Sequence, residues 1–231
     1  MAEARAPRPL EVDAVLFDLD GTLADTAPDL AAALNEVRAT RGMDAMSLSE
    51  LRPWASHGAR GLIGAGMGIA PDAPEYPQLR DAFLDFYAGA LCIDTTLFGA
   101  VDDVLDEIEA RGMRWGIVTN KATRFTQPLL DALGLTARAH AVVCGDTTPH
   151  AKPHPAPLLA AAQMLGTPAA RCVYVGDAER DVTAGVAAGM HTLVARYGYI
   201  TAAETPDAWP ADGSIDSPRA LLDWLPRRAR G

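Results

Sequence analysis

The sequence predicts an α/β protein with a doubly wound parallel sheet and a helical domain inserted after the first strand. After residue 95, short apolar runs alternate with helical stretches, an order typical of a parallel sheet with helices on both faces. The first apolar run, Ala14–Asp18, lies far upstream, and residues 25–94 contain no convincing strand. Because crossovers in such sheets are short, we expect an inserted helical domain at 25–94 and a core domain built from 1–24 and 95–231.

The upstream elements follow from apolar runs and helix start signals. Ala14–Asp18 is an apolar run that ends on a carboxylate, which is typical of a strand buried on both faces. Pro28 fits the first turn of a helix that runs to about Thr40. The spacing of Ser47 and Glu50 fits a capping box. Further helices, broken by Gly and Pro, are expected at Ser47–Trp54, Ala59–Ala65 and Gln78–Leu91.

The alternating half supplies the other strands. Helices, each followed by a glycine, are expected at Val101–Arg111, Thr123–Leu133, Ala156–Leu165 and Asp181–Ala188. Strands are expected at Trp115–Asn120, His140–Cys144, Cys172–Val175 and His191–Ala195. The last of these is the last clear strand, and one more helix is expected near Pro218–Trp224.

Composition narrows the class of partner. A formal net charge of −10 argues against nucleic acid or an anionic membrane as partner. No run approaches the roughly 18 apolar residues of a membrane span, and residues 1–13 lack the apolar region of a secretory signal. Three widely spaced cysteines, Cys92, Cys144 and Cys172, fit reduced and mostly buried thiols. We therefore expect a cytoplasmic protein, and the sequence leaves monomer and homodimer open.

The lysine content is unusual. Among 20 basic residues only Lys121 and Lys152 are lysines. A compact ammonium and a guanidinium are not equivalent in a tight polar pocket. The two lysines are therefore candidates for positions in such a pocket. We expect Lys152 in the site and leave Lys121 outside it, since its side chain can equally face solvent.

Four polar clusters follow strands of the predicted sheet, one of them in the loop before the helix at Ala156–Leu165, and the carboxyl ends of such strands lie side by side. The residues of these clusters are Asp18, Asp20, Thr119, Asn120, Lys152, Asp177 and Asp181. So many carboxylates repel one another unless a cation lies among them, and Mg²⁺ prefers such oxygen ligands. Lys152 and the Thr119 hydroxyl suit an anionic group. A phosphate bound beside Mg²⁺ fits this set of groups.

Four segments in this order resemble the motifs of the haloacid dehalogenase-like (HAD) hydrolase superfamily. They are Asp18–Thr26, Val118–Lys121, Lys152-Pro153 and Val175–Asp181. The resemblance covers nearly the whole chain. It implies a Rossmann-like core and identifies the inserted helical segment as a type C1 cap.

The resemblance also implies a mechanism and residue roles. Asp18 attacks phosphorus to form an aspartyl-phosphate, and Asp20 protonates the leaving oxygen and then activates water. That role needs Asp20 to be protonated part of the time, and burial beneath the cap is the expected cause. Mg²⁺ is held by the carboxylates of Asp18 and Asp177 and by the carbonyl of Asp20. The phosphoryl oxygens contact Thr119, Asn120 and Lys152, and Asp181 orients Lys152 or a metal-bound water.

Within the superfamily the residues favour a phosphatase. Haloacid dehalogenases proper lack the second acid, Asp20, and residues 25–94 contain no lysine for the Schiff base of phosphonatases. Mutases of the β-phosphoglucomutase type usually carry a small apolar residue in place of Thr22 and use a cap His/Lys arrangement not seen here. A β-phosphoglucomutase-like phosphotransferase and a non-catalytic phospho-ligand binder stay as alternatives, because fold alone does not establish activity.

The substrate is expected to be a small phosphorylated metabolite. The chain resembles phosphoglycolate phosphatases and N-acetylmuramic acid 6-phosphate phosphatases most, and both the cap stretch Ser56–Arg60 and Tyr197–Tyr199 resemble the second group somewhat more. The cap stretch Ser56–Arg60 resembles the substrate-specificity loop of both. The expected substrate-binding residues of the cap are therefore His57, Gly58, Ala59 and Arg60. We expect Arg60 or His57 to contact the non-phosphate end of the substrate; alternatively, Arg60 only holds the cap to the core.

Overall fold

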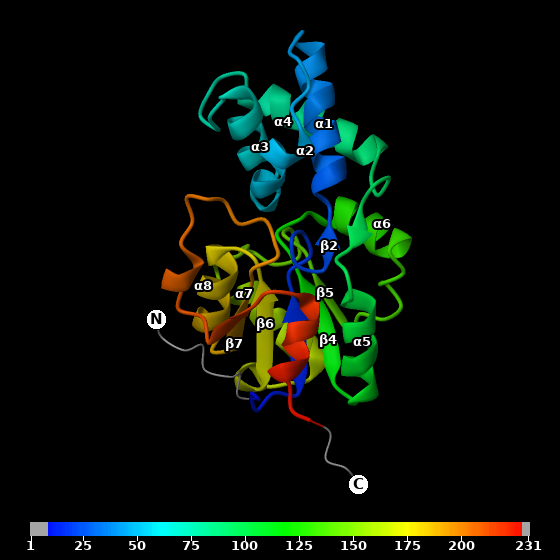
Figure 1. Cartoon of the computed structure of the whole chain (residues 1–231), viewed down its shortest axis with the longest axis vertical. Coiled ribbons are helices and arrows are strands. Elements are labelled where there is room, and N and C mark those ends of the chain that lie inside the picture. Colours follow the sequence, from blue (N-terminus) through cyan, green and yellow to red (C-terminus); the bar gives the residue numbers. More distant parts are fainter. Residues whose placement is uncertain (1–8, 228–231) are drawn as a thin grey trace.

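A parallel six-stranded sheet forms the centre of the core domain. The computed structural model describes residues 9–227 and is shown in Figure 1. The strand order is β5-β4-β1-β6-β7-β8, and every neighbouring pair is parallel. The strands are β1 Ala14–Phe17, β4 Arg114–Val118, β5 Ala141–Val143, β6 Cys172–Gly176, β7 His191–Ala195 and β8 Gly213–Ile215. The strand nearest the N-terminus therefore lies inside the sheet, between β4 and β6.

Helices cover both faces of this sheet. They are α5 Val101–Ala110, α6 Thr123–Ala132, α7 Ala156–Leu165 and α8 Glu179–Ala187, with short 3₁₀ turns η2 Ala169–Arg171, η3 Pro206–Ala208 and η4 Pro218–Asp223. Val15 and Phe17 of β1 pack in one apolar cluster with residues of α5 and α6. Their neighbours Ala14 and Leu16 pack in another with residues of α7 and α8. Since alternate residues of a strand face opposite sides, β1 is buried on both, and the predicted doubly wound fold is confirmed.

The inserted helices stand together beyond one end of the sheet, at the top of Figure 1. They are α1 Ala27–Thr40, α2 Leu48–Leu51, η1 Arg52–His57, α3 Gly58–Met67 and α4 Tyr76–Gly89. Buried side chains of these helices, among them Leu34, Leu62 and Phe83, form a separate apolar cluster, which Phe125 and Tyr199 of the core also join. The capping box of Ser47 and Glu50 at the start of α2 is present as expected. These helices form the cap.

The two chain segments that join the cap to the core are tied to each other. β2 Ala24–Asp25 pairs antiparallel with β3 Thr96–Leu97. The buried carboxylate of Asp29 in α1 accepts hydrogen bonds from the backbone N–H groups of Ile93, Asp94 and Thr95 and from the Thr95 hydroxyl. The outgoing and returning segments are therefore linked to each other, and we call this junction of cap and core the hinge.

The structure differs from the sequence prediction at three short strands and at the last predicted helix. The two-residue strands β2 and β3 were not expected, because two residues carry no periodic pattern. Nor was β8, since Gly213 and Ser214 do not continue an apolar run. The helix expected near Pro218 is the 3₁₀ turn η4. The other predicted elements are present, with boundaries shifted by a few residues.

The cysteines and the helix lengths bear on the expectations from composition. None of the three cysteines forms a disulfide; Cys144 and Cys172 are buried and Cys92 is half-buried. Along residues 9–227, every helix is too short or too polar to cross a membrane.

Candidate active site

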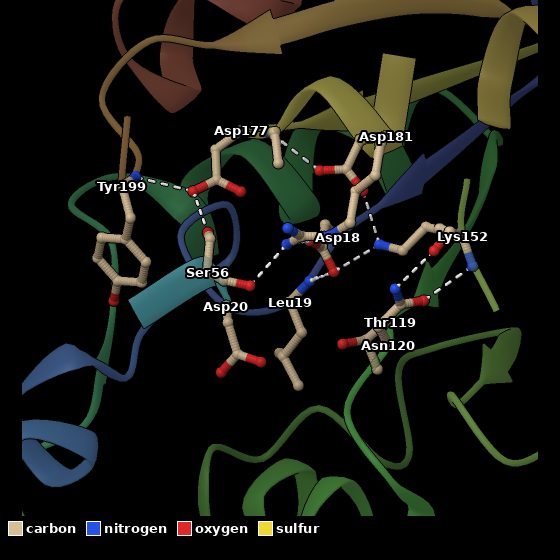
Figure 2. A network of polar contacts seen from close by, with 12 residues as sticks. Asp18, Leu19, Asp20, Ser56, Thr119, Asn120, Lys152, Asp177, Asp181 and Tyr199 are labelled. Carbon is tan, nitrogen blue, oxygen red and sulfur yellow. Dashed lines mark hydrogen bonds and ion pairs between the residues drawn. The ribbon is translucent and has the colours of Figure 1, made fainter. Parts of the chain in front are cut away.

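The carboxyl ends of three neighbouring strands, β4, β1 and β6, bring the predicted residues together. Asp18 directly follows β1, Thr119 follows β4 and Asp177 follows β6. All three are buried, as are Lys152 and Asp181. Figure 2 shows these side chains converging from their separate segments. The neighbourhood predicted from the strand ends is therefore present.

Asp18 has one oxygen held and one free of hydrogen bonds. Its Oδ1 accepts from the Leu19 N–H at 2.8 Å and lies 2.9 Å from Lys152 Nζ. Its Oδ2 lies 4.0 Å from Arg180 Nη2. Burial raises the pKa of Asp18, against the opposing effect of the Lys152 ammonium. The carboxylate is thus fixed in orientation, with one oxygen left for a ligand.

Lys152 is held at several points. Its Nζ donates to the Val118 carbonyl at 2.9 Å and to the Tyr174 hydroxyl at 2.7 Å, and lies 2.8 Å from Asp181 Oδ1. The contact expected between Asp181 and Lys152 is therefore present. Burial disfavours the charge of Asp181, but the cations Lys152 and Arg180 outweigh this and lower its pKa. An ammonium with this many partners is fixed rather than mobile.

The side-chain amide of Asn120 is bonded to the backbone of Lys152, and the residue also lines the cavity beneath the cap, so its expected contact with phosphoryl oxygens stays a prediction. Its Nδ2 donates to the Lys152 carbonyl and its Oδ1 accepts from the Lys152 N–H, both at 2.9 Å. The side-chain amide of Asn120 therefore binds the backbone of Lys152 and positions that residue. The sequence could not show this, because an amide at a strand end suits either partner.

The carboxylates fit a divalent cation. Asp18, Asp177 and Asp181 each offer an oxygen, and these three oxygens lie within 4.8 Å of one another. Both Asp181 oxygens are already engaged, by Lys152 and by the Ala178 N–H. The Oδ1 of Asp177, in contrast, is buried without a hydrogen-bond partner. A buried carboxylate oxygen without a hydrogen-bond partner, surrounded by other carboxylates, is a suitable ligand for a metal ion.

The environment of Asp177 raises its pKa to about 7. The cause is burial, followed by the negative charges of Asp18 and Asp181. Its Oδ2 accepts from the Tyr199 N–H at 2.8 Å and from the Ser56 hydroxyl at 2.6 Å. A cation at this place would relieve the repulsion that keeps a proton on the carboxyl.

Asp20 points away from this cluster. In Figure 2 its carboxylate is turned from Asp18 and Asp177. Its Oδ1 accepts from the Thr26 hydroxyl at 2.6 Å and from Lys121 Nζ at 2.8 Å. The Asp20 side chain is half-buried and not deeply buried beneath the cap as expected. Its environment is set by these two polar contacts. The resemblance assigns the main-chain carbonyl oxygen of Asp20, and not its carboxylate, to the metal.

Two cations were missed by the sequence reasoning. Lys121, which we expected outside the site, has a side chain only 8% exposed and pairs with Asp20. Burial opposes its charge, but the Asp20 carboxylate outweighs this and raises its pKa. Arg180 lies beside Asp18 and donates to the Ser56 carbonyl at 2.8 Å. The rarity of lysine was a usable signal for Lys121, whereas one arginine among many gave none for Arg180.

A cavity of about 1150 Å³ lies between the cap and the core. Asp18, Asp20 and Lys121 line it from the core, and all four expected cap residues, His57, Gly58, Ala59 and Arg60, line it as well. Its apolar lining includes Leu30, Ile69, Phe83, Leu84 and Phe125. Burial, then the nearby Arg180 charge, lowers the pKa of His57. Within the described chain, no ion pair joins Arg60 to the core.

Comparisons with known proteins agree with this architecture. The model of the haloacid dehalogenase-like hydrolase family matches residues 15–195. An N-acetylmuramic acid 6-phosphate phosphatase from Pseudomonas aeruginosa is 40% identical over 218 residues, covering 94% of this chain and 96% of the relative. A phosphoglycolate phosphatase from Xanthomonas campestris is 42% identical over 213 residues, covering 92% and 95%.

Solved structures show the same fold. The crystal structure of a predicted phosphoglycolate phosphatase from Haemophilus somnus superposes with a TM-score of 0.80 at 27% identity and covers 92% of this chain and 97% of its own. The family match spans most of the chain, and the two phosphatase relatives cover nearly all of it. The chain belongs to the haloacid dehalogenase-like hydrolase family.

Proposed function

We propose that the protein is a Mg²⁺-dependent phosphomonoester hydrolase that acts through an aspartyl-phosphate on Asp18. The observation that carries this proposal is the Asp18 carboxylate, which has one oxygen anchored and one free at the floor of the cavity. A nucleophile needs such a free oxygen. The buried ammonium of Lys152 lies 2.9 Å from the other oxygen, Oδ1, and offsets the negative charge of the Asp18 carboxylate. The core is proposed to be 1–24 and 95–231 and the cap 25–94, with β2 and β3 at the junction.

The first step forms a bond between Asp18 Oδ2 and phosphorus and breaks the bond to the leaving oxygen. The leaving oxygen takes its proton from Asp20. Because Lys121 and Thr26 both contact Oδ1 of Asp20, the other oxygen is the one free to carry that proton. In the second step Asp20 takes a proton from the water that hydrolyses the aspartyl-phosphate.

The remaining residues hold the phosphoryl group and the metal. Thr119 Oγ1 already accepts from the Lys121 N–H, so its hydroxyl proton is available for a phosphoryl oxygen. The carboxylates of Asp18 and Asp177 and the carbonyl of Asp20 would hold Mg²⁺, and Asp181 and Asn120 keep Lys152 in place. When bound, Mg²⁺ supplies positive charge between the nucleophile and the phosphate.

The size of the cavity favours a larger substrate over a two-carbon one. At about 1150 Å³ it exceeds the roughly 300–1,000 Å³ typical of small-molecule pockets. A sugar phosphate with an acidic substituent, such as the substrate named for the Pseudomonas aeruginosa relative, would fill more of this cavity than a two-carbon substrate. Phosphoglycolate, the substrate named for the Xanthomonas campestris relative, is the second candidate. His57 and Arg60 lie on the cap wall, where they can contact the non-phosphate end.

Phosphate release tests the proposal. The substrates are N-acetylmuramate 6-phosphate, phosphoglycolate, hexose phosphates and p-nitrophenyl phosphate, with Mg²⁺ or with a chelator. Asp18→Asn is expected to lower kcat by at least about a thousandfold, as removal of a nucleophile does. Asp85→Asn, at an exposed position of α4, is the matched control. Unchanged turnover in Asp18→Asn, or with the chelator, would overturn the proposal. Isomer conversion without phosphate release would indicate the phosphotransferase alternative.

A further inference from the structure

A side chain of the cap reaches the predicted metal ligand. Ser56 lies in η1 of the cap, 121 residues from Asp177 in the chain, and its hydroxyl donates to Asp177 Oδ2 at 2.6 Å. The carbonyl of Ser56 accepts from Arg180 Nη2 at 2.8 Å. One cap residue is thus held by two core residues that flank the carboxylate cluster, as Figure 2 shows for Asp177.

The contact leaves Oδ1 of Asp177 without a hydrogen-bond partner. Ser56 and the Tyr199 N–H both donate to Oδ2, whereas Oδ1 is buried without a partner. Two donors on one oxygen restrict rotation of the carboxylate about its Cβ–Cγ bond. A cation that binds Oδ1 therefore finds the carboxylate already oriented, and it does not need to displace Ser56.

The loop that holds Asp177 from the other side is also attached to the hinge. The Tyr199 hydroxyl donates to Asp25 Oδ1 at 2.7 Å and accepts from the Ala27 N–H at 2.9 Å, where the chain enters the cap. Arg52 of the cap pairs with the same Asp25 oxygen at 2.7 Å. A rotation of the cap about this hinge therefore changes both sets of contacts around Asp177.

We propose that Ser56 is a positioning residue that couples closure of the cap to metal binding at Asp177. The inference rests on the metal-dependent function proposed above. When the cap swings away, Asp177 loses one of the two donors that orient it, so metal binding must also restrict the carboxylate. Coupling between two binding events is reciprocal: contact with the cap raises the affinity for the metal, and the metal favours the state in which the cap touches the core.

Metal titration without substrate tests the coupling. Mg²⁺ alone is titrated calorimetrically into the whole protein and into Ser56→Ala. The loss of a hydrogen bond to a charged group predicts about tenfold weaker binding. Ser49→Ala, an exposed serine of the same cap, is expected to stay within about twofold of the parent, as surface substitutions do. Equal thermal unfolding temperatures in chelator establish that the variants are folded.

Amide hydrogen exchange of residues 52–58 gives a second readout that needs no catalysis. Mg²⁺ is expected to slow exchange there in the parent and in Ser49→Ala, and to leave it unchanged in Ser56→Ala. If the parent binds Mg²⁺ but Ser56→Ala shows the same affinity, or the same slowing, the coupling is wrong and the proposed function stands. If the parent itself does not bind Mg²⁺, the proposed function is wrong and the coupling fails with it.

Discussion

The ammonium of Lys121 lies 2.8 Å from Asp20 Oδ1 and 4.8 Å from the centre of the Tyr87 ring. Asp20 belongs to the core and Tyr87 to α4 of the cap, so one cation contacts both parts of the molecule. Thr26, at the start of the cap, donates to the same Asp20 oxygen. The orientation of the proposed general acid therefore depends on groups from the core, the hinge and the cap.

Replacing Lys121 by Met is expected to lower kcat by about ten- to a hundredfold, the low end of what general acid–base catalysis contributes. The variant leaves Thr26 alone to orient Asp20. Lys121→Arg is not expected to restore the rate, because a planar guanidinium does not replace a point charge in a buried pocket. Steady-state kinetics with p-nitrophenyl phosphate measure this, with Gln127→Met on the exposed side of α6 as control. Unchanged kcat in Lys121→Met would contradict the assigned contact.

The raised pKa of Asp177 predicts proton release on metal binding. With a pKa of about 7, the metal-free carboxyl is largely protonated at pH 6 and ionised at pH 8.5. Calorimetry in buffers of different ionisation enthalpy is expected to show at least about half a proton released per Mg²⁺ at pH 6 and far less at pH 8.5. Equal proton counts at the two pH values would show that Asp177 is not the titrating ligand.

The same group sets a direction for stability without metal. The folded-state pKa lies above the ordinary value of 3.8, so the folded protein binds the extra proton between about pH 4 and 7. The contribution of Asp177 to stability therefore falls as pH rises through that window and is level above it. Urea unfolding in chelator, compared with Asp177→Asn, measures this difference, which is expected to shrink toward pH 4.

Asp29 is expected to be important for stability rather than for chemistry. Asp29→Ala removes the acceptor of three backbone N–H groups and one hydroxyl at the hinge. The Thr95 N–H and hydroxyl are buried, and leaving buried donors unpaired costs about 1–3 kcal/mol per group, so a loss of at least about 2 kcal/mol is expected in urea unfolding. Asp85→Ala, exposed on α4, is expected to change the free energy of unfolding by less than about 0.5 kcal/mol. Similar losses in both variants would count against the hinge contact.

Gly198 is needed because of space, not backbone conformation. A Cβ there would lie 2.3 Å from Asp177 Cβ and 2.4 Å from the Gly21 carbonyl oxygen. Gly198→Ala must therefore displace Asp177, and we expect Mg²⁺ affinity and kcat to fall by more than about tenfold, because a small misplacement at a site is costly. Gly89→Ala, where a Cβ meets nothing within 4 Å, is the matched control for calorimetry and kinetics. Normal metal affinity in Gly198→Ala would show that the loop can yield.

Arg60 is expected to act on the substrate alone. It lines the cavity, so Arg60→Ala should lower kcat/KM for the best large substrate by about tenfold or more, the cost of losing a charged hydrogen bond. The rate with p-nitrophenyl phosphate, which lacks an acidic group beyond the phosphate, should stay nearly unchanged. An equal loss with both substrates would indicate that Arg60 holds the cap in place.

The core of the site could be predicted because sheet geometry places it. Asp18, Thr119 and Asp177 follow neighbouring strands, and parallel strands present their carboxyl ends together. The turn of Asp20 away from Asp18 could not be predicted, because three residues after the strand the chain has already entered a tight turn.

The cap contacts could not be predicted for a different reason. Ser56 meets Asp177 only because of how a whole helical unit is seated on the core. Helical periodicity fixes which side of each cap helix is buried, but it carries no information on that seating. For the same reason the direction of Lys121 was open: it depends on Tyr87, which the cap brings over it.

The placement of both lysines gives the folded protein an unusual chemical surface. Lys152 has a fully buried side chain and Lys121 is 8% exposed beneath the cap, so the described surface offers amine reagents almost no lysine. Acylation of Lys121 then requires the reagent to enter the cavity beneath the cap, which this side chain lines. The rate at which a small acylating reagent modifies this lysine would therefore report how accessible that cavity is, with no label introduced into the chain.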